Sequence, residues 1–72
     1  MKKSDWLRQI DIISQWIRDA GFTLEMYSSA ENQVDFNDRT VHIDSRLHPE
    51  NRCYTLLHEY GHVEISETAA EQ

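Results

Sequence analysis

The sequence has little cysteine and little positive charge. Its single cysteine, Cys53, cannot form a disulfide within the chain, which favours a cytoplasmic protein over a secreted one. Its seven lysine and arginine residues are outnumbered by 13 acidic residues and form no cluster. Because a surface that follows nucleic-acid phosphates needs clustered cations, direct nucleic-acid binding is not expected.

Long hydrophobic runs are also missing. No apolar segment approaches the roughly 20 residues of a membrane span, and the basic residues 1–6 precede no apolar signal region. We therefore predict no membrane association and a cytoplasmic location. Without an internal repeat, low-complexity tract or linker, residues 1–72 form one domain. A domain this short commonly needs a metal, a partner or more chain for stability.

A helix is predicted near the N-terminus. Apolar residues recur at intervals of four, three and four, which places them on one helical face: Trp6, Ile10, Ile13 and Ile17. Ser4 is a suitable N-cap residue. Gly21 suits the left-handed conformation that often ends a helix. The helix therefore spans from about Ser4 to about Ala20, with its apolar face toward a core.

The middle of the chain predicts short strands. Residues 23–27, 34–36 and 40–44 alternate apolar and polar side chains, as half-buried strands do. Asn37 and Asp38 suit the unusual backbone angles of a tight hairpin turn. These segments predict a small antiparallel sheet.

A second helix follows the strands. Pro49 suits the first helical position, where no backbone N–H is needed, and the helical pattern continues to about Ile65. Residues 66–72 resemble the opening of a further helix, so we expect that the domain is truncated at its C-terminus. The predicted class is α+β, with a helix, a small sheet and a second helix in sequence order.

The second helix contains the motif His58-Glu59-Tyr60-Gly61-His62. Histidines four residues apart lie one turn apart on the same side of a helix, so both imidazoles can bind one Zn²⁺ ion at about 2.0–2.1 Å. Glu59 points roughly 100° away from His58. It is therefore placed to act as a general base on a zinc-bound water, whose pKa zinc lowers to about 7. Gly61 lets another backbone approach.

The segment from Leu56 to His62 resembles the active-site helix of zincin metallopeptidases. The form His-Glu-x-Gly-His, after a short strand, is most similar to the ImmA/IrrE type, over about residues 34–65. The resemblance implies a cytoplasmic, phage- or mobile-element-associated peptidase that hydrolyses a protein or peptide substrate. It also implies zinc binding by His58 and His62, with Glu59 as the catalytic base.

The third metal ligand is not evident from the sequence. Catalytic zinc sites usually have three protein ligands. The metzincin pattern is excluded, because Thr68 stands where its third histidine would be. Among Glu64, Glu67 and Glu71, the last is the best candidate in this chain. Otherwise the ligand lies beyond residue 72, or the site is completed by water or by another chain.

A second hypothesis is a noncatalytic zincin-like module. Such a module binds a protein partner through its tryptophan helix or its sheet edge, or a second copy of the chain, with or without zinc and without turnover. Trp16, at the edge of the apolar face, is the tryptophan expected to meet such a partner. A chance match of the motif on a solvated helix is the simplest alternative. His42 and His48 are expected at the surface, and Cys53 in the core.

Overall fold

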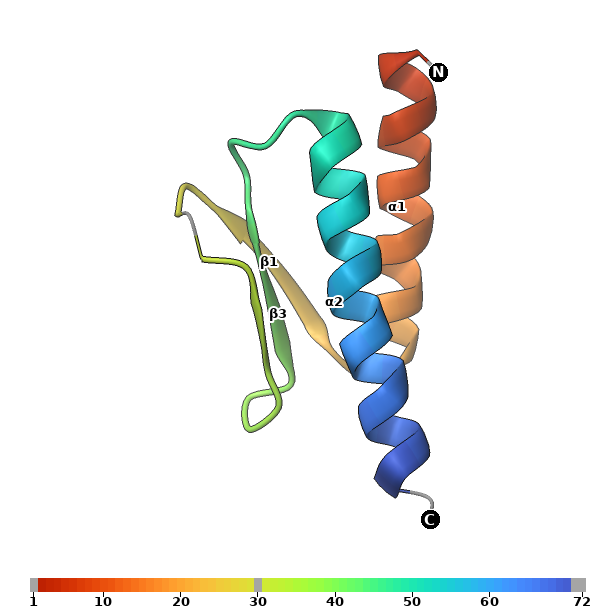
Figure 1. Cartoon of the computed structure of the whole chain (residues 1–72), viewed down its shortest axis with the longest axis vertical. Helices are drawn as coiled ribbons and strands as arrows, with labels where there is room; N and C mark the ends of the chain where they lie inside the picture. Colours follow the sequence, from red (N-terminus) through yellow and green to blue (C-terminus); the bar gives the residue numbers. More distant parts are fainter. Residues whose placement is uncertain (1, 30, 71–72) are drawn as a thin grey trace.

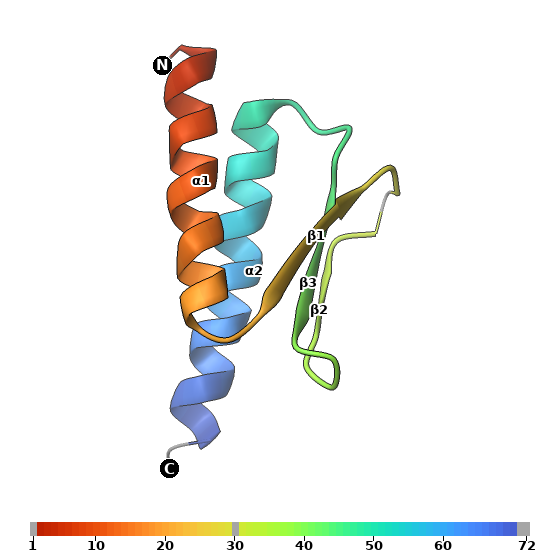
Figure 2. The same ribbon diagram turned by 180° about the vertical axis from the view of Figure 1, so that it is seen from behind.

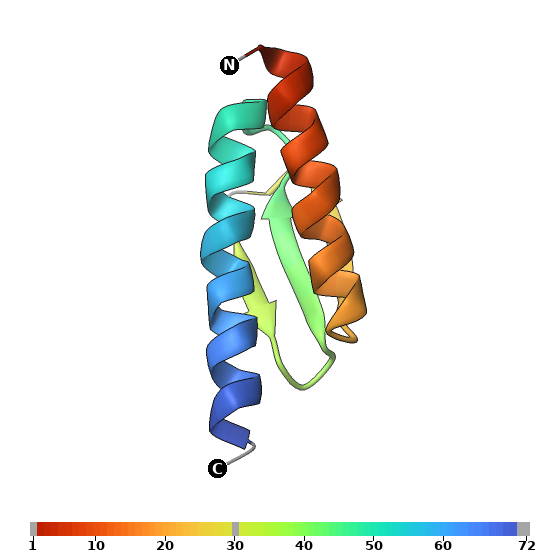
Figure 3. The same ribbon diagram turned by 90° about the vertical axis from the view of Figure 1, so that its right-hand side faces the viewer.

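The structure, a computed structural model, describes the backbone of residues 2–29 and 31–70 and the side chains of these ranges up to Ser66. The elements are, in order, α1 (Lys3–Asp19), β1 (Thr23–Tyr27), β2 (Gln33–Asp35), β3 (Thr40–Asp44) and α2 (Pro49–Ala70). Both helices cover the same face of the sheet and run in the same direction (Figures 1 and 3). The predicted α+β class is therefore confirmed.

α1 buries the apolar face that its sequence spacing predicted. Ile10, Ile13 and Ile17 are all buried, and the fully buried Ile17 anchors the end of this face. The helix starts one residue earlier than expected, at Lys3, so Ser4 is not its cap; instead the Lys2 N–H donates to the Asp5 carboxylate at 3.1 Å. A carboxylate in the first turn stabilises the exposed N–H groups of a helix start.

The end of α1 is held by a residue far away in the sequence. Gly21 adopts φ 88°, as predicted, and its N–H donates to the Arg18 carbonyl. The Arg39 guanidinium donates to the Ala20 and Gly21 carbonyls at 2.8 and 3.2 Å and lies 4.5 Å from the Phe22 ring centroid. Arg39 therefore joins the turn before β3 to the C-terminus of α1.

The turn before β3 differs from its prediction. Among the described residues, the non-glycine residue with positive φ (52°) is Arg39, and not Asn37 or Asp38. The Asp35 carboxylate accepts the N–H groups of Asn37 and Asp38 and holds the turn from its start. The strained position is therefore stabilised by the contacts of the Arg39 side chain rather than by residue type.

The sheet is mixed rather than antiparallel throughout, with strand order β1-β3-β2. β2 and β3 are antiparallel as predicted, but β1 and β3 run parallel and pair Thr23 with Thr40 through Tyr27 with Asp44. The chain passes from β1 to the far edge, and β3 then fills the centre (Figure 2). The central position of β3 fits its two apolar residues, Val41 and Ile43, which are almost fully buried.

α2 begins at Pro49, as predicted, and continues beyond Ile65 to Ala70. Residues 66–70 therefore extend this helix and do not open a new one, because neither proline nor a left-handed glycine interrupts the pattern. The face that packs on α1 and the sheet contains Cys53, Leu56 and Val63, each at most 3% exposed. In the described part of the chain, no helix is long and apolar enough to cross a membrane.

Candidate metal centre

The motif lies in the middle of α2, at the border between its buried and exposed sides. Glu59 follows the buried Leu56 by three residues and precedes the buried Val63 by four, so it lies on the core side. His58 and His62 are exposed and lie on the neighbouring side. α2 contacts β3 and the edge strand β2, whereas α1 contacts β1. The motif therefore belongs to the helix that covers the β2 side of the sheet.

The two histidine side chains converge. Their Nε2 atoms are 3.2 Å apart, and the rings meet edge to face with centroids 4.7 Å apart. Two nitrogens that each bind a tetrahedral Zn²⁺ at about 2.0–2.1 Å are about 3.3–3.4 Å apart. The pair therefore fits the two protein positions of one zinc ion without a change of backbone.

Glu59, at 6% exposure, is one of two carboxylates among the described residues that are almost buried. No hydrogen bond or ion pair joins its carboxylate to another described residue, whereas the comparably buried Asp44 is paired with Arg46. The Glu59 oxygens are not among the fully buried atoms that lack a partner, so the carboxylate still reaches solvent. A water or cation beside the histidines can therefore bind it.

The third protein ligand is not found among the described residues. They contain no group of three histidine, cysteine, aspartate or glutamate side chains that could hold a metal. The Glu64 carboxylate accepts a hydrogen bond of 2.5 Å from the Tyr60 hydroxyl. The side chains of Glu67 and Glu71, the second being the best candidate from the sequence, lie outside the described residues.

The other histidines lie away from the motif. His42 is on the sheet face opposite the helices, where its Nδ1 is 3.6 Å from the Glu25 carboxylate. His48 is exposed beside the start of α2, where it lines a cavity with Lys3 and Glu50. It precedes His58 by ten residues, almost three helical turns. Neither histidine joins the site.

The remaining candidates have simpler roles. Cys53 is buried, as expected, and burial raises the pKa of its thiol, which opposes a role as a nucleophile. No side chain or backbone of another described element comes within 4 Å of the position of a Cβ on Gly61, so the expected close approach is not found in the described part of the chain. Trp16 is 43% exposed and packs against Tyr60 at 5.5 Å between centroids.

One comparison with known proteins gives a match. The model of the family Peptidase_M78, described as IrrE N-terminal-like domain, matches residues 17–72. The matched region contains the end of α1, the whole sheet and all of α2, including the motif. No curated protein and no solved structure matches the chain significantly.

Proposed function

Because this chain belongs to the family of IrrE N-terminal-like peptidase domains, we propose that it is a zinc-dependent metallopeptidase that hydrolyses peptide bonds of a protein substrate. The observation that supports this proposal most directly is the separation of 3.2 Å between the Nε2 atoms of His58 and His62, beside the almost buried Glu59. Two imidazoles that converge beside an almost buried carboxylate are the arrangement that a hydrolytic zinc site needs.

In this mechanism the two histidines and the glutamate of the motif have separate roles. His58 and His62 would hold the metal through Nε2, and zinc, when bound, would supply the Lewis acidity that makes water a nucleophile near neutral pH. Glu59 is about 60° from His62 around the helix axis and cannot bind the metal in the same way. Its carboxylate takes the proton of the attacking water and returns it to the amine that leaves.

The proposal is tested by Glu59→Gln, which keeps the size of the side chain but removes the base. We expect unchanged zinc stoichiometry by elemental analysis and a loss of cleavage of about 10²–10⁴-fold on a quenched-fluorescence peptide library. His58→Ala with His62→Ala should remove both zinc and cleavage. His42→Ala is the matched control, because it removes a histidine from the opposite face of the sheet.

Two results would contradict the proposal in different ways. Cleavage by Glu59→Gln at the wild-type rate would remove Glu59 from the mechanism. Stoichiometric zinc in the wild type without cleavage of any library peptide would favour the noncatalytic zinc-binding module. The observation that supports this second function is that the described residues contain no group of three histidine, cysteine, aspartate or glutamate side chains that could hold a metal.

A further inference from the structure

The edge of the sheet far from the motif has backbone groups without a partner among the described residues. The Thr23 N–H donates to the Arg39 carbonyl and the Tyr27 carbonyl accepts from Ser45, so these residues of β1 direct their backbone toward β3. Since successive residues of a strand point to opposite sides, Leu24 and Met26 direct their N–H and carbonyl groups to the free edge. β1 is therefore a template for one more strand.

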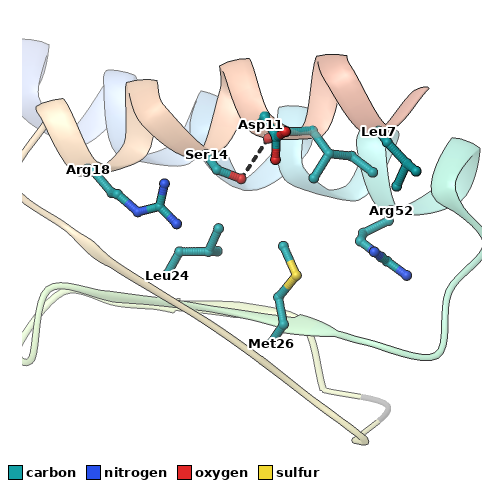
Figure 4. A pocket seen from close by; sticks show the side chains of 8 residues that line it. Leu7, Asp11, Ser14, Arg18, Leu24, Met26 and Arg52 are labelled. Carbon is teal, nitrogen blue, oxygen red and sulfur yellow. Dashed lines mark hydrogen bonds between the residues drawn. The ribbon is translucent and has the colours of Figure 1, made fainter. Parts of the chain in front are cut away.

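The side chains of the same two residues line a hollow. Leu24 and Met26 project from β1 toward α1, where Leu7 and Ile10 form the opposite wall of a cavity of about 470 Å³ (Figure 4). Met26 is 38% exposed, although the residue that pairs with it, Ile43, is 1% exposed. A strand added to β1 would direct alternate side chains into this cavity and cover Met26.

The two ends of the hollow are cationic. Arg18 stands at one end and Arg52 at the other (Figure 4). Two backbone carbonyls, those of Ser45 and Leu47, accept hydrogen bonds from Arg52 Nη2 and fix this guanidinium, while its Nε–H has no partner among the described residues. The Arg52 Nε–H is buried, but its Nη1 makes no hydrogen bond to another described residue and can bind an acidic side chain. Arg18 is exposed, and its side chain has no partner among the described residues, so it can bind one as well.

The acidic group of the hollow lies between these ends. Asp11 and Ser14 line the wall formed by α1, and the Ser14 hydroxyl donates to the Ile10 carbonyl at 2.6 Å. Two arginines and one aspartate leave an excess of positive charge in a chain whose net charge is −6. The charge of the hollow is thus opposite to that of the whole chain.

We propose that this groove, defined by β1 and the facing side of α1, binds an extended peptide segment of another protein that has apolar side chains between two acidic ones. The segment adds to the free edge of β1 through the backbone of Leu24 and Met26. Its apolar side chains fill the hollow, and its acidic side chains pair with Arg18 and Arg52. The site is separate from the motif, which lies on the helix that covers β2.

A second copy of the chain fits this edge poorly. A symmetric pair of β1 strands would be antiparallel, so the Arg18 end of each groove would face the Arg52 end of the other. This arrangement brings like charges together and offers neither guanidinium a carboxylate. Charge complementarity therefore selects a partner of acidic and apolar chemistry.

The proposal is tested with a synthetic peptide of sequence Glu-Thr-Val-Thr-Val-Thr-Glu, which has the same order from either end and so tests both strand directions. Titration into ¹⁵N-labelled protein should shift the amide signals of β1 and of the facing side of α1. A matched peptide with lysine in place of both glutamates should bind at least about tenfold more weakly.

Two variants separate backbone pairing from charge. Met26→Pro removes one N–H of the free edge and no bond to β3, so the fold should persist while affinity falls about tenfold or more. Arg18→Glu should weaken binding by a similar factor. Arg8→Glu is the matched control, since Arg8 is an exposed arginine of the same helix outside the groove, and it should change affinity less than about twofold.

Three results would overturn the proposal. The first is the absence of shifts in β1 and α1 up to millimolar peptide. The second is equal affinity for the glutamate and lysine peptides. The third is equal weakening by Arg18→Glu and Arg8→Glu, which would indicate a general effect of net charge. Should Met26→Pro unfold, as seen by circular dichroism, the arginine pair still decides the outcome.

Discussion

The two edges of the sheet differ in how the helices cover them. α2 lies over β3 and β2, and the motif sits on its exposed margin. Of the two helices, α1 makes the main contact with β1, and an open groove remains beside that strand. The same alternation of apolar residues therefore gives two outcomes. Val41 and Ile43 of β3 are at most 1% exposed, whereas Met26 of β1 is 38% exposed. β3 is the central strand and lies under the helix pair, whereas β1 is an edge strand. The position of a strand in the sheet, and not its alternation pattern, therefore decides how deeply its apolar side chains are buried.

The largest expected effect comes from the truncation of two side chains that pair across β1 and β3. Ile43→Ala should cost about 2–5 kcal/mol of unfolding free energy, because it opens a cavity in the centre of the core. Met26→Ala, at the position that pairs with it, should cost less than about 1.5 kcal/mol, since part of that side chain already contacts water. Urea unfolding measures both. Equal costs would show that β1 is as closed as β3.

Removal of metal should lower the stability of the domain only through the loss of the contacts of His58 and His62. If zinc binds the folded state alone, it stabilises that state by mass action, and a chelator should lower the Tm by several degrees. A change of 1 kcal/mol shifts the Tm of a domain this short by about 4–8 °C. His58→Ala with His62→Ala should abolish the effect of the chelator, and His42→Ala should preserve it. Unchanged melting of zinc-loaded wild type after verified metal removal would make the metal incidental to stability.

The smallest expected effect is a dependence on pH at the end of β3. Hydrogen bonds from the Arg46 side chain, then from its backbone N–H, lower the pKa of Asp44. A carboxylate with a lowered pKa in the folded state stabilises that state above its unfolded pKa. This contribution is lost as pH falls through the folded pKa. The Tm difference between wild type and Asp44→Asn should therefore shrink between about pH 4 and pH 2. A constant difference would contradict the role of this pair.

Local signals predicted the elements well. The spacing of Ile10, Ile13 and Ile17 predicted α1 and its buried face, and Gly21 and Pro49 marked the end of one helix and the start of the other. These features depend on neighbours within a few residues, so the sequence contains them directly. The sequence does not predict the extension of α2 to Ala70, because the apolar periodicity fades after Ile65, where alanine is the only apolar residue.

Nonlocal features were not predictable from the pattern. Nothing near Arg39 in the sequence indicates that its side chain would join Ala20 and Gly21, because the contact spans almost 20 residues. The parallel pairing of β1 with β3 was missed for the same reason. Alternation shows which side of a strand is apolar but not which strand lies beside it or in which direction.

For the candidate metal centre, the sequence by itself determined the approach of two imidazoles, because a spacing of four on a helix places His58 and His62 one turn apart. It also placed Glu59 next to them. Only the tertiary structure decided that Glu59 is almost buried while both histidines are exposed, since this depends on the sheet against which α2 packs. The groove beside β1 was likewise decided by packing. Leu24, Met26, Arg18 and Arg52 come from three different elements, and only their assembly makes one surface.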